Sequence, residues 1–173
     1  MGRTCVWVAC LGVVLGGCSR GDTDRYLQGL RSANPEFQKQ AVVYLGQHGD
    51  ATVVPELLAV LDHGPRSDVK PLIAEALGRL ADRRAAPHLL RILQDPDPEA
   101  RTAAIVAMTK IRAPEFVAPL AAAAQAGDSR LSAIWALGAL GEPGAVPVLS
   151  ELLQDPDKYV RYNARQALKR LVP

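Results

Sequence analysis

Apolar residues recur with helical spacing at five places along the chain. Around one large central residue, apolar side chains stand eight, four and one positions before it and three after it, as at Val160, Ala164, Ala167, Leu168 and Leu171. This spacing lines one side of an α-helix, which has 3.6 residues per turn. The alternation typical of β-strands is absent and alanine is abundant, so we predict an all-α chain.

These helical stretches repeat at a nearly constant interval. The central residues are 29 to 32 positions apart and are Leu45, Leu77, Met108, Leu137 and Leu168. Between them a proline recurs, at Pro55, Pro87, Pro119 and Pro147, and each opens a second apolar helix, in whose first turn its missing N–H is not needed. Repeats of this length are typical of solenoids. We therefore predict a right-handed α-solenoid of stacked antiparallel helix pairs over residues 34–173, with about four and a half repeats.

Two nearly identical stretches mark the corners between units. They read "LQDPDPEAR" from Leu93 and "LQDPDKYVR" from Leu153. The aspartates of both stretches can accept N–H groups at the start of the following helix and favour its dipole; they are Asp95, Asp97, Asp155 and Asp157. A calcium site would need further oxygen ligands, which the corners lack.

The repeated phrase resembles HEAT repeats, specifically the phycobilisome-lyase HEAT-like type. It runs Asp-Pro-Asp, a valine or alanine, Arg, then Ala-x-x-Ala-Leu-Gly-x-Leu and a proline-led second helix, and it covers residues 35–172. The resemblance implies a ladder in which a basic residue, seven positions before the central one, links successive units with the preceding aspartate. That position holds Gln38, Lys70, Arg101, Arg130 and Arg161.

The third unit departs from this pattern. Met108-Thr109 replaces Leu-Gly, and four alanines at positions 121–124 follow Pro119 where other units have leucines. Less apolar area is then available for burial, so we expect the second helix of this unit to pack thinly.

The N-terminus has the pattern of a signal peptide. A basic start is followed by an apolar stretch from Thr4 to Gly17, shorter than the roughly 20 residues of a membrane-spanning helix. Its end, Leu15-Gly16-Gly17-Cys18, resembles the lipobox of bacterial lipoproteins, which implies cleavage before Cys18 and a lipid on its sulfur. The alternative is an ordinary signal peptide that contains a cysteine.

The expected mature chain begins at the lipidated cysteine. Residues 1–17 form the signal peptide, and residues 18–33 hold Cys18, a tether and a possible capping helix. Cys5 and Cys10 leave with the signal peptide, so no intramolecular disulfide is possible. The resemblance implies an exported lipoprotein anchored in a membrane and facing the periplasm, and Ser19 favours the outer membrane.

Charge and chemistry restrict the function further. The chain has 20 Lys and Arg against 18 Asp and Glu, whereas nucleic-acid binding needs a basic face. No triad or phosphate-binding loop is present. HEAT-like relatives include bilin lyases and deoxyhypusine hydroxylase, whose di-iron site uses His-Glu dipeptides, but here Gly or Leu follows His48, His63 and His88. We therefore expect no enzyme, no metal or other cofactor and no nucleic acid.

Two functions remain. The first is a lipid-anchored, non-enzymatic scaffold, monomeric apart from an unidentified protein partner; the second is an accessory or catalytic subunit of the lyase or hydroxylase kind. The second helices of a solenoid offer a binding face, so we take their polar positions as candidates: Glu56, His88, Arg91, Gln94, Glu151 and Gln154. Trp135 is added because its position holds both polar and apolar residues in other units, which indicates partial exposure; packing between units is the alternative.

Overall fold

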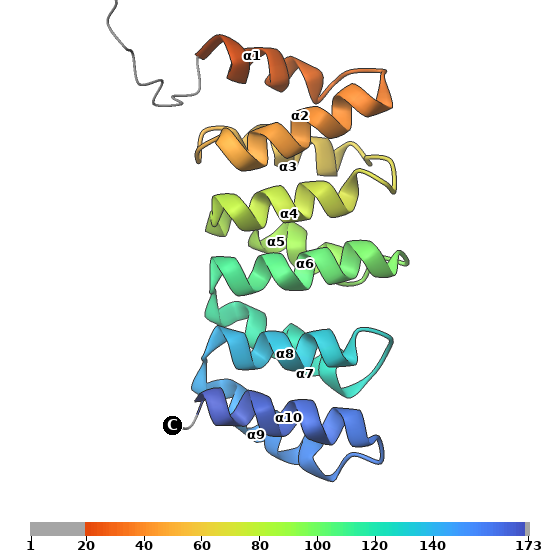
Figure 1. Cartoon of the computed structure of the whole chain (residues 1–173), viewed down its shortest axis with the longest axis vertical. Coiled ribbons are helices and arrows are strands. Elements are labelled where there is room, and N and C mark those ends of the chain that lie inside the picture. Colours follow the sequence, from red (N-terminus) through yellow and green to blue (C-terminus); the bar gives the residue numbers. More distant parts are fainter. Residues whose placement is uncertain (1–19, 172–173) are drawn as a thin grey trace, which may run out of the picture.

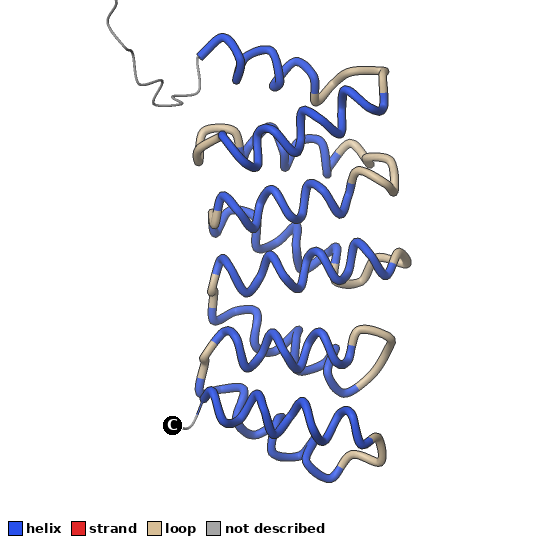
Figure 2. Tube along the Cα trace, viewed as in Figure 1, coloured by secondary structure: helices blue, strands red, loops and turns tan. Residues whose placement is uncertain are grey.

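The computed structural model describes residues 20–171, and every regular element in that range is helical (Figure 2). Apart from α1 (Arg20–Gly29), the α-helices form two groups. The first helices are α2 (Pro35–His48), α4 (Lys70–Leu80), α6 (Pro98–Ile111), α8 (Arg130–Leu140) and α10 (Lys158–Leu171). The second helices are α3 (Val54–Asp62), α5 (Ala86–Ile92), α7 (Val117–Gln125) and α9 (Val146–Glu151). Short 3₁₀ turns are η1 (Arg83–Ala85), η2 (Pro114–Phe116), η3 (Pro143–Ala145) and η4 (Leu152–Gln154).

The helices stack into two layers. In Figure 1 the first helices run side by side down the front of the molecule, and the second helices lie behind them. The corners that lead into the first helices lie along one edge, and the turns between the two helices of a unit lie along the opposite edge. This arrangement confirms the predicted α-solenoid. The expected signal peptide and Cys18 lie outside the described residues.

Neighbouring first helices approach closely where glycine meets alanine. A Cβ atom placed on Gly78 would lie 2.7 Å from the Cα atom of Ala107, and one on Gly138 would lie 2.7 Å from that of Ala167. At the first contact, a Cβ on Gly46 would lie 2.6 Å from the Cβ of Ala76. No real Cβ fits at such distances, so glycine at this position sets how tightly the units stack.

The contact between α6 and α8 lacks this glycine. Thr109 occupies the position, and its hydroxyl donates a hydrogen bond of 2.7 Å to the carbonyl oxygen of Val106. Figure 1 shows α6 and α8 further apart than α4 and α6. The departure noticed in the third unit therefore widens one step of the stack.

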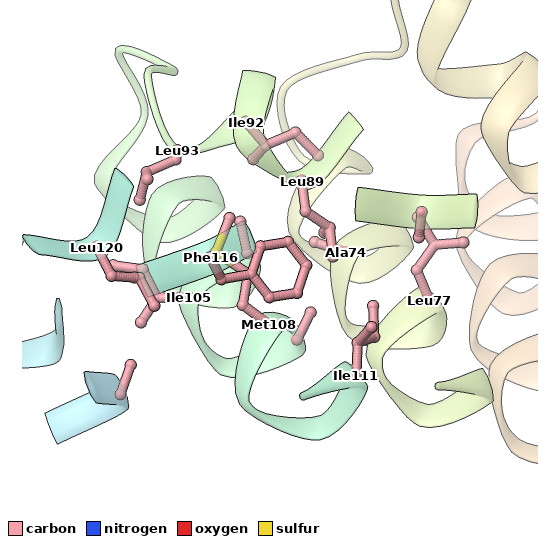
Figure 3. Packing of buried hydrophobic residues seen from close by; sticks show 14 of the residues in the cluster. Ala74, Leu77, Leu89, Ile92, Leu93, Ile105, Met108, Ile111, Phe116 and Leu120 are labelled. Carbon is pink, nitrogen blue, oxygen red and sulfur yellow. The ribbon is translucent and has the colours of Figure 1, made fainter. Parts of the chain in front are cut away.

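The expectation that the second helix of the third unit packs thinly is wrong for its first half. Pro119 stands eleven residues after Met108, whereas Pro87 stands ten after Leu77, so Leu120 takes the place that Leu89 holds in the second unit. Both leucines are fully buried. Phe116, also fully buried, replaces Ala85 and lies between Met108 and Leu89 in Figure 3.

The expected thinness holds at the other end of α7. Ala123 occupies the place of Ile92, and a cleft of about 500 Å³ opens beside it. Leu93, Arg101 and Asp128 also line this cleft. Phe116 and Leu120 thus supply the apolar volume at the start of α7, whereas the alanines at its end leave a cleft.

Phe116 should therefore contribute strongly to stability. We predict that Phe116→Ala lowers the free energy of unfolding by about 3–5 kcal/mol, because it leaves a cavity between two units. The control Tyr159→Ala, at a side chain exposed on α10, should change it by less than about 0.5 kcal/mol. Urea unfolding followed by circular dichroism measures both, and equal effects of the two substitutions would contradict the assigned packing.

Candidate functional site

The two aspartates of each Asp-Pro-Asp corner have different roles. The second caps the following helix: Asp97 accepts a 2.9 Å hydrogen bond from the N–H of Glu99, and Asp157 accepts one of 2.8 Å from the N–H of Tyr159. The first closes the corner, since Asp95 accepts from the N–H of Asp97 at 3.0 Å. Its other carboxylate oxygen is then free to meet the preceding unit.

Basic residues connect the corners into a ladder along this edge. Lys70 Nζ lies 2.7 Å from the carboxylate of Asp95, and Arg130 pairs with Asp155. Arg101 reaches Ser129 with its Nε at 3.2 Å and donates from Nη1 to the carbonyl oxygens of Asp95 and Pro96. Arg161 holds the carbonyl oxygens of its own corner, those of Asp155 and Pro156.

The first rung of the ladder was missed in the sequence. Gln38, at the expected position, donates to the carbonyl oxygen of Leu30 at 2.8 Å, while its neighbour Lys39 pairs with Asp68 at 2.9 Å. Lys39 stands one position after the repeated basic position and still reaches the corner, so the repeat spacing alone does not predict this ion pair.

Most of the polar candidates on the second helices link neighbouring units. His88 Nε2 and Arg91 Nη2 both lie near Oδ1 of Asp62, at 3.1 and 2.9 Å. Glu56 pairs with Arg31 at 2.9 Å, and Glu151 accepts a long hydrogen bond of 3.5 Å from Gln125. Gln94 and Gln154 are exposed. Four of the six candidates therefore form contacts between units: Glu56, His88, Arg91 and Glu151. Gln94 follows the end of α5 and Gln154 lies in η4, so, contrary to the prediction, neither is on a second helix. Partner binding by all six stays a prediction.

Trp135 lies on the other layer. It belongs to α8 and is 42% exposed, so its side chain is partly covered and partly in contact with solvent, as its mixed occupancy in the repeats indicates. Leu131, one helical turn earlier, is exposed to the same degree. The tryptophan therefore points to the solvent on the face of the first helices, away from the other candidates.

A cleft of about 610 Å³ opens at the corner edge of the first unit. Its lining combines an apolar part with cations: Leu30, Arg31, Gln38, Glu56, Ala59, Val60, His63, Gly64, Pro65 and Arg66. Arg31 is paired with Glu56, and Arg66 donates from Nε to Asp68 at 3.1 Å. Pockets of this size bind small ligands, and these groups suit an anion with an apolar body. The spacing gave no sign of it, because its residues come from three separate segments.

The described part of the chain holds no evident metal site and no membrane span. Within residues 20–171, no group of three or more His, Cys, Asp or Glu side chains could hold a metal ion. No helix in the same range has both the length and the apolar character that are needed to cross a bilayer.

The fold and the repeated corner define the class of protein. The family model described as HEAT repeats matches residues 23–109, 64–131 and 87–169, so the chain belongs to the HEAT-repeat family.

Two relatives and one solved complex are similar to most of this chain. The chain is 29% identical over 161 residues to the uncharacterized phycocyanin operon protein Z of Pseudanabaena tenuis, covering 86% of this chain and 79% of the relative. It is 29% identical over 164 residues to phycocyanobilin lyase subunit alpha of a Nostoc species, covering 82% of this chain and 59% of that relative. The solved complex of CpcE and CpcF of phycocyanin lyase, also from Nostoc, has the same fold, with a TM-score of 0.73 and 22% identity over 99% of this chain and 70% of the matched one.

These relatives contradict the prediction that the chain is not an enzyme. One is a subunit of phycocyanobilin lyase. A non-enzymatic function was predicted because one chain holds no complete set of catalytic groups, whereas the phycocyanin lyase structure is a complex of two proteins. A missing triad or His-Glu pair therefore does not exclude a lyase subunit.

The ladder should make stability depend on pH. The N–H of Asp157, above all, and the guanidinium of Arg130 hold the pKa of the Asp155 carboxyl below its usual range, against its partial burial. A pKa lowered by folding gives stability that is present above the unfolded value of about 3.9 and lost as the pH falls through the folded value.

We predict a free energy of unfolding that is level near neutral pH and falls in acid. Asp155→Asn should reduce stability at neutral pH and make the fall in acid shallower, whereas Asp24→Asn, which is outside the ladder and beyond the first turn of α1, should change neither. Urea unfolding at a series of pH values measures this. An identical acid profile for Asp155→Asn and the unchanged chain would contradict the role of the ladder.

Proposed function

We propose that this protein is a HEAT-repeat subunit of a lyase that acts on a linear tetrapyrrole together with a protein partner. The observation that carries the proposal is the similarity to phycocyanobilin lyase subunit alpha over most of this chain. The shared fold with the two-protein phycocyanin lyase complex supports a partner subunit.

The cleft of the first unit supports the substrate class. A linear tetrapyrrole has a long apolar body with two propionate groups. Arg31 and Arg66 supply guanidinium groups that can hydrogen-bond carboxylates with two parallel N–H donors, and Val60 and Pro65 supply apolar contact. His63 also lines the cleft, and its Nδ1 lies 2.6 Å from the carbonyl oxygen of Ala59.

The corresponding role of the chain is binding and orientation. The arginines would hold the propionates, the apolar wall would cover the conjugated body, and the partner subunit would complete the reaction site. Glu56 keeps Arg31 in place in the absence of a ligand, because their ion pair is 2.9 Å long. A bound carboxylate would have to share or replace this partner.

Binding of phycocyanobilin tests the proposal. We expect the full chain to change the absorbance spectrum of added phycocyanobilin, and Arg31→Gln or Arg66→Gln to weaken binding by about 10-fold or more, since a hydrogen bond to a charged group contributes about 1.5–3 kcal/mol. Arg83→Gln is the control. Arg83 is exposed and paired with Glu115 at 2.9 Å, but it lies on the opposite edge of the stack, so this variant should bind phycocyanobilin as the unchanged chain does. No binding, or equal losses in all three variants, would contradict the proposal.

We also propose that the chain is held at the bacterial cell envelope, facing the periplasm, by a lipid on Cys18. The support is the stretch Leu15-Gly16-Gly17-Cys18 behind a short apolar segment, with Ser19 favouring the outer membrane. Two or more acyl chains give a firm anchor, because each buried methylene contributes about 0.8 kcal/mol.

Substitution of the cysteine tests this localisation. We predict that Cys18→Ser yields a chain without lipid, found unprocessed or outside the lipid-anchored fraction, whereas Ser19→Ala is processed and lipidated as before. Membrane fractionation and intact-protein mass spectrometry read out both. A processed and lipidated Cys18→Ser variant would contradict the proposal.

A further inference from the structure

The last first helix, α10, differs in charge from the rest of the molecule. It carries five cations and no acidic residue: Lys158, Arg161, Arg165, Lys169 and Arg170. Residues 20–157 carry 14 Lys and Arg and 18 Asp and Glu, a net charge of −4. The near-neutral net charge of the chain therefore combines a basic last helix with an acidic remainder.

Two of these cations, Arg165 and Lys169, stand at repeat positions that in the other first helices pack against the next unit. Arg165 stands three residues before the central leucine, where the preceding first helices have buried apolar residues: Val42, Ala74, Ile105 and Ile134. Lys169 stands one residue after it, in place of Gly46, Gly78, Thr109 and Gly138. Burying these two charges under another HEAT unit would be costly, so this face suits a different kind of contact.

Most of the charges on α10 have no acidic partner. Within residues 20–171, Lys158, Arg165, Lys169 and Arg170 take part in no ion pair, and all four are exposed. Arg161 alone is engaged, with the carbonyl oxygens of its corner. The helix therefore presents positive charge that the chain itself does not neutralise.

Large exposed apolar side chains gather on α10 and on the neighbouring first helix, α8. Leu131 and Trp135 lie on α8, and Tyr159 and Tyr162 lie on α10, with exposed fractions of 43%, 42%, 60% and 61%. Leu131 and Tyr162 stand at the same position of their repeats, six residues before the central leucine. On α10, Tyr162, Arg165 and Lys169 follow one another at intervals of three and four residues, so they lie on one side of the helix. The neighbouring helix α8 runs beside α10 in Figure 1 and packs against it, and it carries Leu131 at the repeat position of Tyr162.

We propose that this α8–α10 face, formed by Leu131, Trp135, Tyr162, Arg165, Lys169 and Arg170, rests on the surface of an anionic lipid bilayer. Tryptophan and tyrosine accumulate at the membrane–water interface, and Lys and Arg near an anionic leaflet are attracted to it. The apolar side of α10, with Val160, Ala164 and Ala167, is already buried in the stack, so the helix lies on the surface and does not insert.

The shape of the face favours a membrane over an acidic polypeptide. Peptide ligands dock in grooves, and the clefts described above lie elsewhere, at the first unit and beside α7. The α8–α10 face instead presents side chains outward from two adjacent helices. A bilayer surface can meet such a face without a matching groove.

Trp135 itself can report the contact. In the full chain carrying Trp7→Phe and Cys18→Ser, Trp135 is the only tryptophan and no lipid is attached at residue 18. Vesicles of equal parts phosphatidylcholine and phosphatidylglycerol, with brominated acyl chains as quenchers, should shift Trp135 emission to the blue and quench it. Phosphatidylcholine vesicles should do neither, and high salt should reverse the effect.

A matched pair of triple variants isolates the cations. In this background Arg165→Gln, Lys169→Gln and Arg170→Gln together should abolish the shift, whereas Arg25→Gln, Arg79→Gln and Arg83→Gln, which remove the same charge elsewhere, should preserve it. Circular dichroism establishes that both variants are folded. Three results would overturn the proposal: no change with anionic vesicles, the same change with zwitterionic vesicles, or a cation-dependent change with poly-L-glutamate and none with vesicles, which would assign the face to an acidic protein.

Discussion

The whole stack depends on the close approach of glycine and alanine between successive first helices. Gly46, Gly78 and Gly138 leave no room for a side chain against the next helix, and each faces an alanine. This contact brings the helix axes close enough for the second helices behind them to share one continuous core. It also fixes the step at which each corner meets the next, so that Lys70 reaches Asp95 and Arg130 reaches Asp155.

The one step without glycine shows how the fold adapts. At Thr109 the first helices α6 and α8 stand further apart, and the third unit, to which Thr109 belongs, uses a different set of core residues. Phe116 reaches into the space between units where the second unit has Ala85, while the alanines late in α7 leave a cleft. The sequence therefore predicted where the irregular unit lies, but the compensation required knowing which side chains meet across two units.

The same distinction holds for the candidate site. Helices, corners and the positions of Lys70, Arg101 and Arg130 follow from a repeated spacing, which is a local property of the chain. The rung from Lys39 to Asp68 and the cleft between Arg31 and Arg66 arise when separate segments come together, so no spacing indicates them. The prediction of a non-enzymatic protein failed for a related reason, because a search for complete catalytic motifs in one chain does not find enzymes that consist of two subunits, such as the phycocyanin lyase complex. Bilin binding at the first unit and bilayer contact at α8–α10 would use opposite ends of the stack and are independent of each other.

The glycine contact is tested most directly by adding one methyl group. In an open position of a helix interior, Gly→Ala stabilises a helix by up to about 1 kcal/mol. Gly21, in the first turn of α1 with nothing near its missing side chain, should show a smaller stabilisation or none when it becomes alanine. Gly78→Ala should instead lower the free energy of unfolding by about 1–3 kcal/mol, because the methyl group meets the backbone of Ala107. Urea unfolding of the two variants beside the unchanged chain decides between them. A stabilising effect of Gly78→Ala would contradict the claim that this contact sets the spacing of the stack.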